Sequence, residues 1–143
     1  MNRDPLSDIQ ARFRKIPFHD SKLVEVQIAR GIGTSDDVAL EILMRDTSAP
    51  YRLTFTAAAV FEARLDLDAK RVCGDDIAAG ECLLRSPWMD SIEQANPHDT
   101  PLQGFAHFIV QLIHPGGKIN VLARDFQFLP DDGQSVTGRL QTK

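Results

Sequence analysis

Cysteine is scarce in this chain: Cys73 and Cys82 are the only two among 143 residues. Two thiols do not make the disulfide framework that small secreted domains use. Their Cys-x8-Cys spacing also differs from the closely paired ligands of a structural zinc site. The sequence therefore predicts free, buried thiols, with no metal and no cofactor.

Long apolar runs are absent as well. No stretch approaches the roughly 20 residues that a membrane-spanning helix needs. The first residues, Met-Asn-Arg-Asp-Pro-Leu-Ser-Asp, lack the apolar core of a secretory signal. We expect a cytoplasmic protein that does not bind membranes.

Positive charge is neither abundant nor concentrated. Sixteen basic residues face twenty acidic ones, for a net charge of -4. Their only small cluster, Arg12, Arg14 and Lys15, falls in a predicted helix, where a solvated face explains it. This balance argues against nucleic acid as a partner.

The chain has the size and composition of a single globular domain spanning 1–143, in which 1–5 and 131–143 are expected to be frayed. Hydrophobic residues make up 43% and charged residues 25%, as in ordinary globular proteins. Alternating apolar and polar residues predict strands. These strands cover 22–28, 38–44, 51–66 and two segments within 105–128.

Two of these strands have a clear apolar face, and one is ambiguous. Val24, Val26 and Ile28 share one face of the first strand. The second strand places Val38, Leu40, Ile42 and Met44 on one face. Residues 57–71 are also rich in helix formers, so strand and helix both remain open there. We interpret 51 to about 66 as a strand, bent or bulged near its alanines, and 68–81 as a loop with at most one helical turn.

Capping patterns predict two helices. Ser7 is a candidate N-cap for a short N-terminal helix, and Pro17 ends it. Ser86 can cap a second helix near 87–95, since Pro87 suits the first helical position. The predicted fold class is α+β, a mainly antiparallel sheet of about five strands with these two helices.

The segment from Phe105 to Phe128 predicts a β-hairpin around the sequence His-Pro-Gly-Gly. Pairing Ile113 with Lys118 would place Phe108 opposite Ala123. One face is then wholly apolar; its residues are Phe108, Val110, Leu112, Ile119, Val121 and Ala123. A one-residue slip would expose these residues or bury charge.

The opposite face of this hairpin is mixed and supplies the candidate ligand site. The same register places His107 opposite Arg124 and Phe105 opposite Phe126. Polar groups with an apolar rim are one way to build a binding pocket. A partly covered sheet face carrying a single polar pair would give the same pattern, so both interpretations stay open.

No catalytic or metal signature accompanies this site. The chain has no Gly-x-Ser-x-Gly elbow. His19 and Asp20 open a strand, where neighbours point to opposite faces. The pairs Asp36-Asp37, Asp75-Asp76 and Asp131-Asp132 lack the spacing of a calcium loop. The sequence thus predicts no catalytic residues, and an enzyme is the less favoured interpretation.

The order of three short motifs carries a family resemblance. Phe18-His19-Asp20-Ser21 opens a strand, Leu53-Thr54-Phe55 follows, and His107 lies in a strand paired to Ile119-Asn120-Val121-Leu122-Ala123. Over about residues 17–128 this resembles small bacterial proteins of unassigned function, some of which look like immunity proteins of polymorphic toxin systems. The resemblance implies a binding role and transfers no functional residues.

Three hypotheses for function follow. The first is a nonenzymatic binding protein, immunity-like as the resemblance implies, that recognises a protein partner; the net acidity suits a basic surface on that partner. The alternative is a small-molecule binding domain or an enzyme that uses the mixed face around His107 and Arg124. The third is a homodimer in which that mixed face is the interface.

Overall fold

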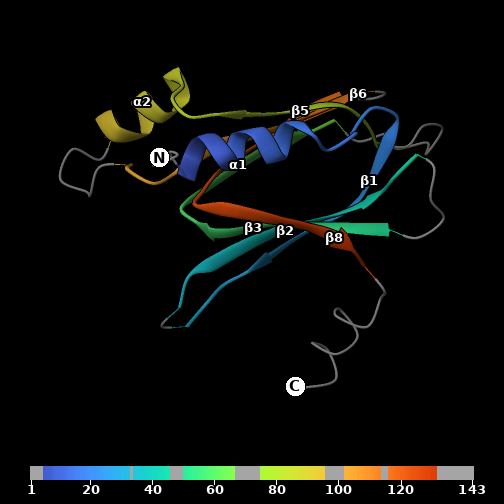
Figure 1. The fold of residues 1–143 in the computed structure, drawn as a ribbon, viewed down its shortest axis with the longest axis horizontal. Coiled ribbons are helices and arrows are strands. Elements are labelled where there is room, and N and C mark those ends of the chain that lie inside the picture. The colour runs from blue at the N-terminus through green and yellow to red at the C-terminus, as the bar shows by residue number, and fades with distance from the viewer. Residues whose placement is uncertain are drawn as a thin grey trace.

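The computed structural model describes residues 5–32, 34–45, 50–66, 75–95, 102–113 and 116–131. Within them lie two helices and one eight-stranded sheet whose strand pairs are all antiparallel (Figure 1). The α+β class is confirmed, but the number of strands is eight rather than about five. The elements are α1 (Pro5–Arg14), β1 (Ser21–Ala29), β2 (Asp36–Leu43), β3 (Pro50–Ala58), β4 (Val60–Leu65), β5 (Asp75–Leu83), α2 (Pro87–Ala95), β6 (Ala106–Ile113), β7 (Gly116–Ala123) and β8 (Asp125–Pro130).

Two breaks and one missed strand account for the difference. The predicted strand over 51–66 is interrupted at Ala59, after Ala57 adopts a φ of 52°, and becomes β3 and β4. The second strand predicted within 105–128 is likewise interrupted at Arg124, which separates β7 from β8. β5 was predicted as loop, because Gly80 and the Asp75-Asp76 pair obscured its alternation. Residues 67–71 of the strand-or-helix ambiguity lie outside the described residues.

The sheet curls back on itself. Its order is β4-β7-β6-β5-β1-β2-β3-β8. Because β3 runs on into β4 and β7 runs on into β8, the ladders β3–β8 and β4–β7 form one bent two-stranded ribbon between β2 and β6. Within the described part of the chain, two corners of the folded sheet remain unpaired. One lies between β8 and β5, and the other lies between β4 and the end of the β1–β2 hairpin.

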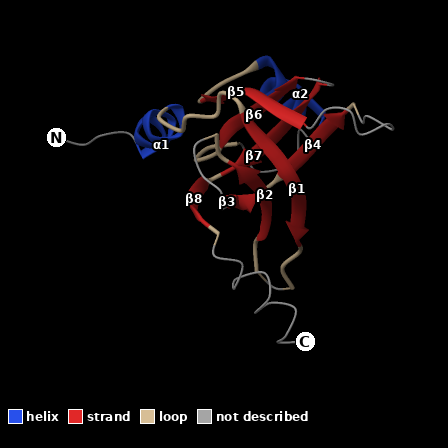
Figure 2. Ribbon diagram, turned by 90° about the vertical axis from the view of Figure 1, so that its right-hand side faces the viewer, coloured by secondary structure: helices blue, strands red, loops and turns tan. Residues whose placement is uncertain are grey.

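Helix α1 fills the first of these corners, which we call the covered corner (Figure 2). Phe13 is fully buried there, and its ring lies 5.0–5.1 Å from the rings of Phe108 and Phe126. Gly80 of β5 makes room for two rings of this region, since a Cβ at this position would lie 2.3 Å from the ring of Phe18, which follows α1, and 3.2 Å from that of Phe13 on α1. The glycine that hid β5 in the sequence is therefore a packing requirement.

α1 begins at Pro5 rather than after Ser7, so Ser7 lies inside the helix and is not its N-cap. Proline suits the first helical position because its missing N–H would have no intrahelical partner there. At the other end of the chain, Asp131 is buried and its N–H donates to Pro50 O at 2.8 Å. Residues 1–4 and 132–143 lie outside the described residues.

The core lies between the two layers of the curled sheet, and β2 and the β6–β7 hairpin supply much of it. Val38, Leu40, Ile42 and Met44 are all buried, as their alternation predicted. The apolar face predicted for the hairpin is buried too. Its members are Phe108, Val110, Leu112, Ile119, Val121 and Ala123.

The predicted register of that hairpin is wrong by two residues. Ile113 pairs with Gly116, and Phe108 pairs with Val121. A two-residue shift keeps every side chain on its face, which is why the buried set was still predicted correctly. Gly117 is part of β7 rather than of the turn. It must be glycine, because a Cβ there would lie 2.2 Å from Arg64 O of β4.

β1 departs from its predicted alternation. A bulge between Leu23 and Glu25 shifts the pairing with β2. A bulge inserts a residue and changes which face the following side chains occupy. The bulge leaves Val24 58% exposed, and Ile28, near the end of β1, is 48% exposed, so the predicted buried face over Val24, Val26 and Ile28 does not form as a unit.

Helix α2 is confirmed over Pro87–Ala95. Ser86 caps it, because Ser86 Oγ accepts from Met89 N–H at 3.2 Å. Neither described helix has the length and apolar character needed to cross a membrane.

Candidate functional site

His107 is buried beneath α2, with 4% of its surface exposed. Its Nδ1 lies 2.8 Å from Ser86 Oγ and its Nε2 lies 2.8 Å from Asn120 Oδ1. The amide oxygen only accepts, so Nε2 carries the proton and Nδ1 accepts from the serine hydroxyl. The Trp88 ring packs on the imidazole at 4.3 Å between centroids.

This environment keeps the imidazole neutral. Burial lowers the pKa of His107, the hydrogen bond to Asn120 opposes that effect, and the charge of Lys118 adds to it. A serine next to a histidine resembles a nucleophile with its base. Here, however, Ser86 is 4% exposed and its oxygen already caps α2. The arrangement serves to fasten α2 onto β6.

Arg124 does not lie opposite His107, because the actual register pairs His107 with Leu122. The Arg124 guanidinium instead lies 4.4 Å over the ring of Phe105, as a cation–π contact. Phe126 belongs to the core around Phe13. Of the four predicted ligand-binding residues, the structure thus pairs Phe105 with Arg124, encloses His107 separately and buries Phe126. A ligand role for any of them stays a prediction.

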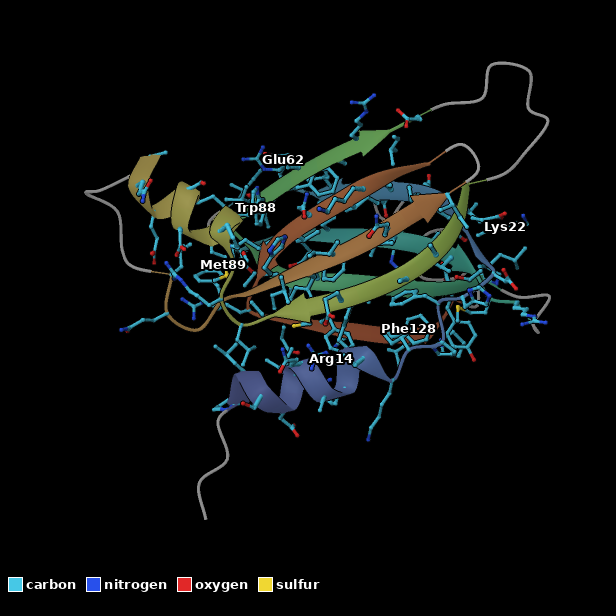
Figure 3. The ribbon with its side chains drawn as sticks, turned by 90° about the horizontal axis from the view of Figure 1, so that it is seen from above. Arg14, Lys22, Glu62, Trp88, Met89 and Phe128 are labelled. Carbon is cyan, nitrogen blue, oxygen red and sulfur yellow. The ribbon has the colours of Figure 1, made fainter. Side chains whose placement is uncertain are left out.

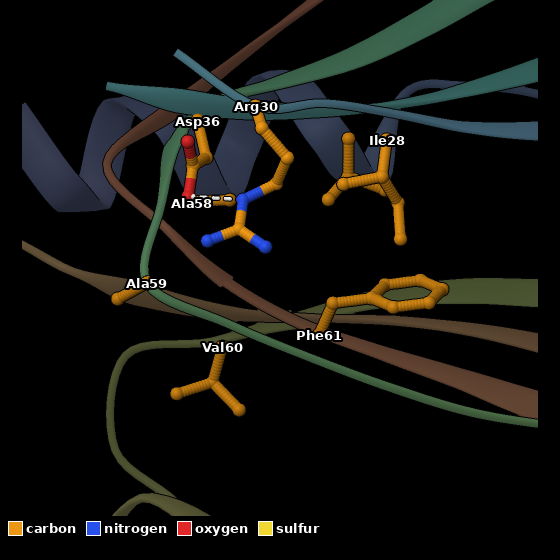
Figure 4. A pocket seen from close by; sticks show the side chains of 8 residues that line it. Ile28, Arg30, Asp36, Ala58, Ala59, Val60 and Phe61 are labelled. Carbon is orange, nitrogen blue, oxygen red and sulfur yellow. Dashed lines mark hydrogen bonds and ion pairs between the residues drawn. The ribbon is translucent and has the colours of Figure 1, made fainter. Parts of the chain in front are cut away.

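The second corner of the sheet, between β4 and the end of the β1–β2 hairpin, holds a pocket of about 290 Å³ (Figure 4). We call it the uncovered corner. Its lining residues are Ile28, Arg30, Asp36, Val38, Ala58, Ala59, Val60 and Phe61. They come from four separate strands and the connections that follow β1 and β3, which is why no local motif identified them.

Arg30 and Asp36 are the charged groups of this pocket. Arg30 Nε donates to Asp36 Oδ2 at 3.0 Å, and Gly31 N–H donates to Asp36 Oδ1 at 2.8 Å. Asp36 therefore fixes one edge of the guanidinium. The two terminal amino groups make no hydrogen bond within the described part of the chain, and Figure 4 shows them directed toward the β4 side of the pocket.

Two carboxylates adjoin farther along β1 and β2. Glu25 of β1 pairs with Glu41 of β2, and Glu41 pairs in turn with Arg52 of β3. Burial raises the pKa of Glu41, and the charges of Asp131 and Glu25 raise it further, against the opposing effect of Arg52. Arg52 is 8% exposed and donates to Gln27 Oε1.

Groups for metal binding or thiol chemistry are not assembled in the described residues. No cluster of three or more His, Cys, Asp or Glu side chains occurs among them. Burial raises the pKa of Cys82 to about 12, so this thiol is a core group rather than a nucleophile. Cys73 lies outside the described residues.

Comparisons with protein-family models, with curated proteins and with solved structures found no match.

Proposed function

We propose that this protein is a nonenzymatic binding protein that recognises a protein partner through the uncovered corner. One observation carries the proposal: the apolar side chains along the outer stretch of β1 are exposed. Beyond Leu23, β1 is paired only with β2 among the described strands. Val24 is 58% exposed and Ile28 is 48% exposed on this stretch.

Edge strands with exposed apolar side chains invite another strand to pair with them, and natural proteins normally protect such edges. The covered corner shows such protection within the same molecule. Gln10 of α1 donates to Cys82 O of β5 at 2.8 Å, and the helix covers the apolar side chains beneath it. A partner strand placed between β1 and β4 would do for the uncovered corner what α1 does for the other.

The charge beside this edge favours a basic partner over a second copy. Glu25 and Glu41 adjoin, and repulsion from Glu25 contributes to the raised pKa of Glu41. A lysine or arginine of the partner would relieve that repulsion. Two copies meeting along β1 would instead bring like charges together, which destabilises cross-strand pairs. This basic partner also suits the immunity-like role that the sequence resemblance implies.

A photo-crosslinking amino acid placed at Val24 tests the proposal in the cells that produce this protein. Leu129 on β8 is the matched control, since it is also an apolar strand residue that is 58% exposed. We expect one basic protein to be trapped from position 24 and not from position 129. The purified pair should then bind at least about tenfold more weakly with Val24→Asp than with Leu129→Asp, and more weakly as salt rises.

Equal trapping at the two positions, or equal affinities of the two variants, would refute the proposal. Trapping of a second copy alone would favour the homodimer. Binding to a purified metabolite that His107→Ala or Arg124→Ala abolishes would favour the small-molecule alternative.

A further inference from the structure

The pocket at the uncovered corner lies where a strand added to β4 would have to end. Among the described strands, β4 is the last in the sheet order, and β7 is its only partner. Asp66 N–H donates to Gly116 O at 3.0 Å. Because antiparallel hydrogen bonds alternate along a strand, the N–H and C=O groups of Phe61, Ala63 and Leu65 point away from β7.

The free edge of β4 is closed at its beginning. There Asp36 of β2 pairs with Ala58 of β3, and the chain turns at Ala59 into β4. An added strand antiparallel to β4 would run toward this turn, with its carboxyl end leading. It would meet the closed end of the corner rather than continue past it, so the end suits a chain terminus.

The pocket offers the two features that a terminal residue needs. Ile28 and Phe61 face each other across it and leave space for an apolar side chain (Figure 4). The terminal amino groups of Arg30 form the planar fork that binds carboxylates in a bidentate manner. At about 290 Å³ the pocket lies at the lower end of the range for small-molecule sites, which suits one residue better than a cofactor.

We propose that the uncovered corner binds the carboxyl-terminal strand of a partner protein. The strand pairs antiparallel with β4, its last side chain lies between Ile28 and Phe61, and its terminal carboxylate binds Arg30. This inference rests on the proposed function, because it names the part of the partner that enters the corner. It requires neither catalysis nor a cofactor.

Peptide pairs test it directly. N-acetylated hexapeptides of alternating threonine and valine, each ending in valine, leucine, isoleucine or phenylalanine, are made as the free acid and as the amide. NMR titration of the full chain follows the amides of Phe61, Ala63 and Leu65. We expect at least one free acid to bind about tenfold or more tightly than its amide.

Arg30→Gln should abolish the preference for the acid over the amide. Arg45→Gln is the matched control, because Arg45 is likewise an exposed arginine in an ion pair, with Asp20 at 3.6 Å. It should preserve the preference. If Arg30→Gln also unfolds the chain, Arg30→Lys serves instead, since lysine keeps the charge but loses the fork.

Equal affinity of acid and amide for all four terminal residues would overturn the inference, as would the absence of binding by every peptide. Binding of 4-methylpentanoate as tight as that of the peptides, without shifts along β4, would overturn it in favour of a small carboxylate ligand. In each of these cases, a partner trapped at Val24 whose affinity Arg30→Gln leaves unchanged would show that the proposed function survives without this terminal contact.

Discussion

The two unpaired corners of the curled sheet differ in whether a described element covers them. At the covered corner, α1 places Phe13 among four other phenylalanine rings and supplies ion pairs from Arg12 to Asp125 and from Arg14 to Glu81. At the uncovered corner, no described element covers β4 or the outer stretch of β1. Figure 3 shows Arg14 of α1 and Glu62 of β4 on opposite sides of the molecule.

The difference separates a corner that stabilises the fold from one that is available for binding. Both are lined with apolar side chains, so hydrophobicity alone does not distinguish them. What distinguishes them is whether an element among the described residues covers them. Substitutions at the covered corner should therefore lower stability, whereas substitutions at the uncovered corner should leave the fold largely intact.

The largest expected effect is that of Phe13→Ala. Removing a fully buried phenylalanine should lower the free energy of unfolding by about 3–5 kcal/mol. Phe61→Ala at the uncovered corner removes a half-buried ring and should cost only about 1–2 kcal/mol. Urea unfolding measures both. Equal losses would mean that the two corners are equally part of the core.

Gly80→Val should be the next most damaging change. The added Cβ would lie 2.3 Å from the ring of Phe18 and 3.2 Å from that of Phe13, so these rings or β5 must shift. Overpacking of this kind costs about 1–3 kcal/mol. If urea unfolding detects no loss of stability, the rings of Phe13 and Phe18 pack against β5 less tightly than the structure indicates. Ala59→Val at the edge of the pocket is the control and should have a smaller effect, because Ala59 is exposed.

The pKa values of two carboxylates should be shifted in opposite directions. Burial favours a higher pKa for Glu81, but the hydrogen bonds from Arg14 and Cys82 N–H and the charge of Arg14 outweigh it and lower the pKa. Glu81 therefore stabilises the fold above its unfolded pKa, and this stabilisation is lost as the pH falls through the folded pKa. The pKa of Glu41 is raised, so its contribution is present in acid and is lost as the pH rises through its folded pKa.

NMR titration of the side-chain carboxyl carbons measures the two pKa values separately. We expect the order Glu81 below Glu41, with Arg14→Gln raising only the value of Glu81. Glu41→Gln should remove its opposing contribution and increase stability at pH 7. The reverse order of the two pKa values would contradict the electrostatic surroundings that the structure gives to Glu81 and Glu41.

The smallest expected effects are those of two arginines. Arg12→Gln breaks an exposed ion pair with Asp125 and a cation–π contact 4.8 Å from the Phe126 ring, so it should cost up to about 1 kcal/mol. Arg30→Gln breaks a single ion pair of a side chain that is 79% exposed, so it should cost less. Thermal unfolding of the two variants side by side decides which corner depends on its arginine.

Much of the fold could be predicted from the sequence, because the relevant signals are local. Alternation correctly assigned the buried faces of β2 and of the β6–β7 hairpin, and the Ser86-Pro87 pair located α2. β5 was not predicted because Gly80 interrupts its alternation. That glycine is required by the ring of Phe18, more than sixty residues away in the sequence. The hairpin register shifted for a similar reason, since Gly117 is required by the backbone of β4 rather than by the turn.

The candidate site was harder to predict. His107 and Arg124 do not pair as predicted, and neither do Phe105 and Phe126; Arg124 instead lies over the ring of Phe105. The pocket brings together Ile28, Arg30 and Phe61, whose proximity depends on how the sheet curls. Alternation assigns a residue to a face of its strand but not to a corner between strands. The bulge in β1 that exposes Val24 leaves no composition signal either.

Hydrogen–deuterium exchange of β4 in the presence of the partner trapped at Val24 tests the central claim most directly. If the partner adds a strand at the uncovered corner, the amides of Phe61, Ala63 and Leu65 become protected. Those of Glu62 and Arg64, which already face β7, change little. Unchanged exchange at Phe61, Ala63 and Leu65 with the partner saturating would contradict the account.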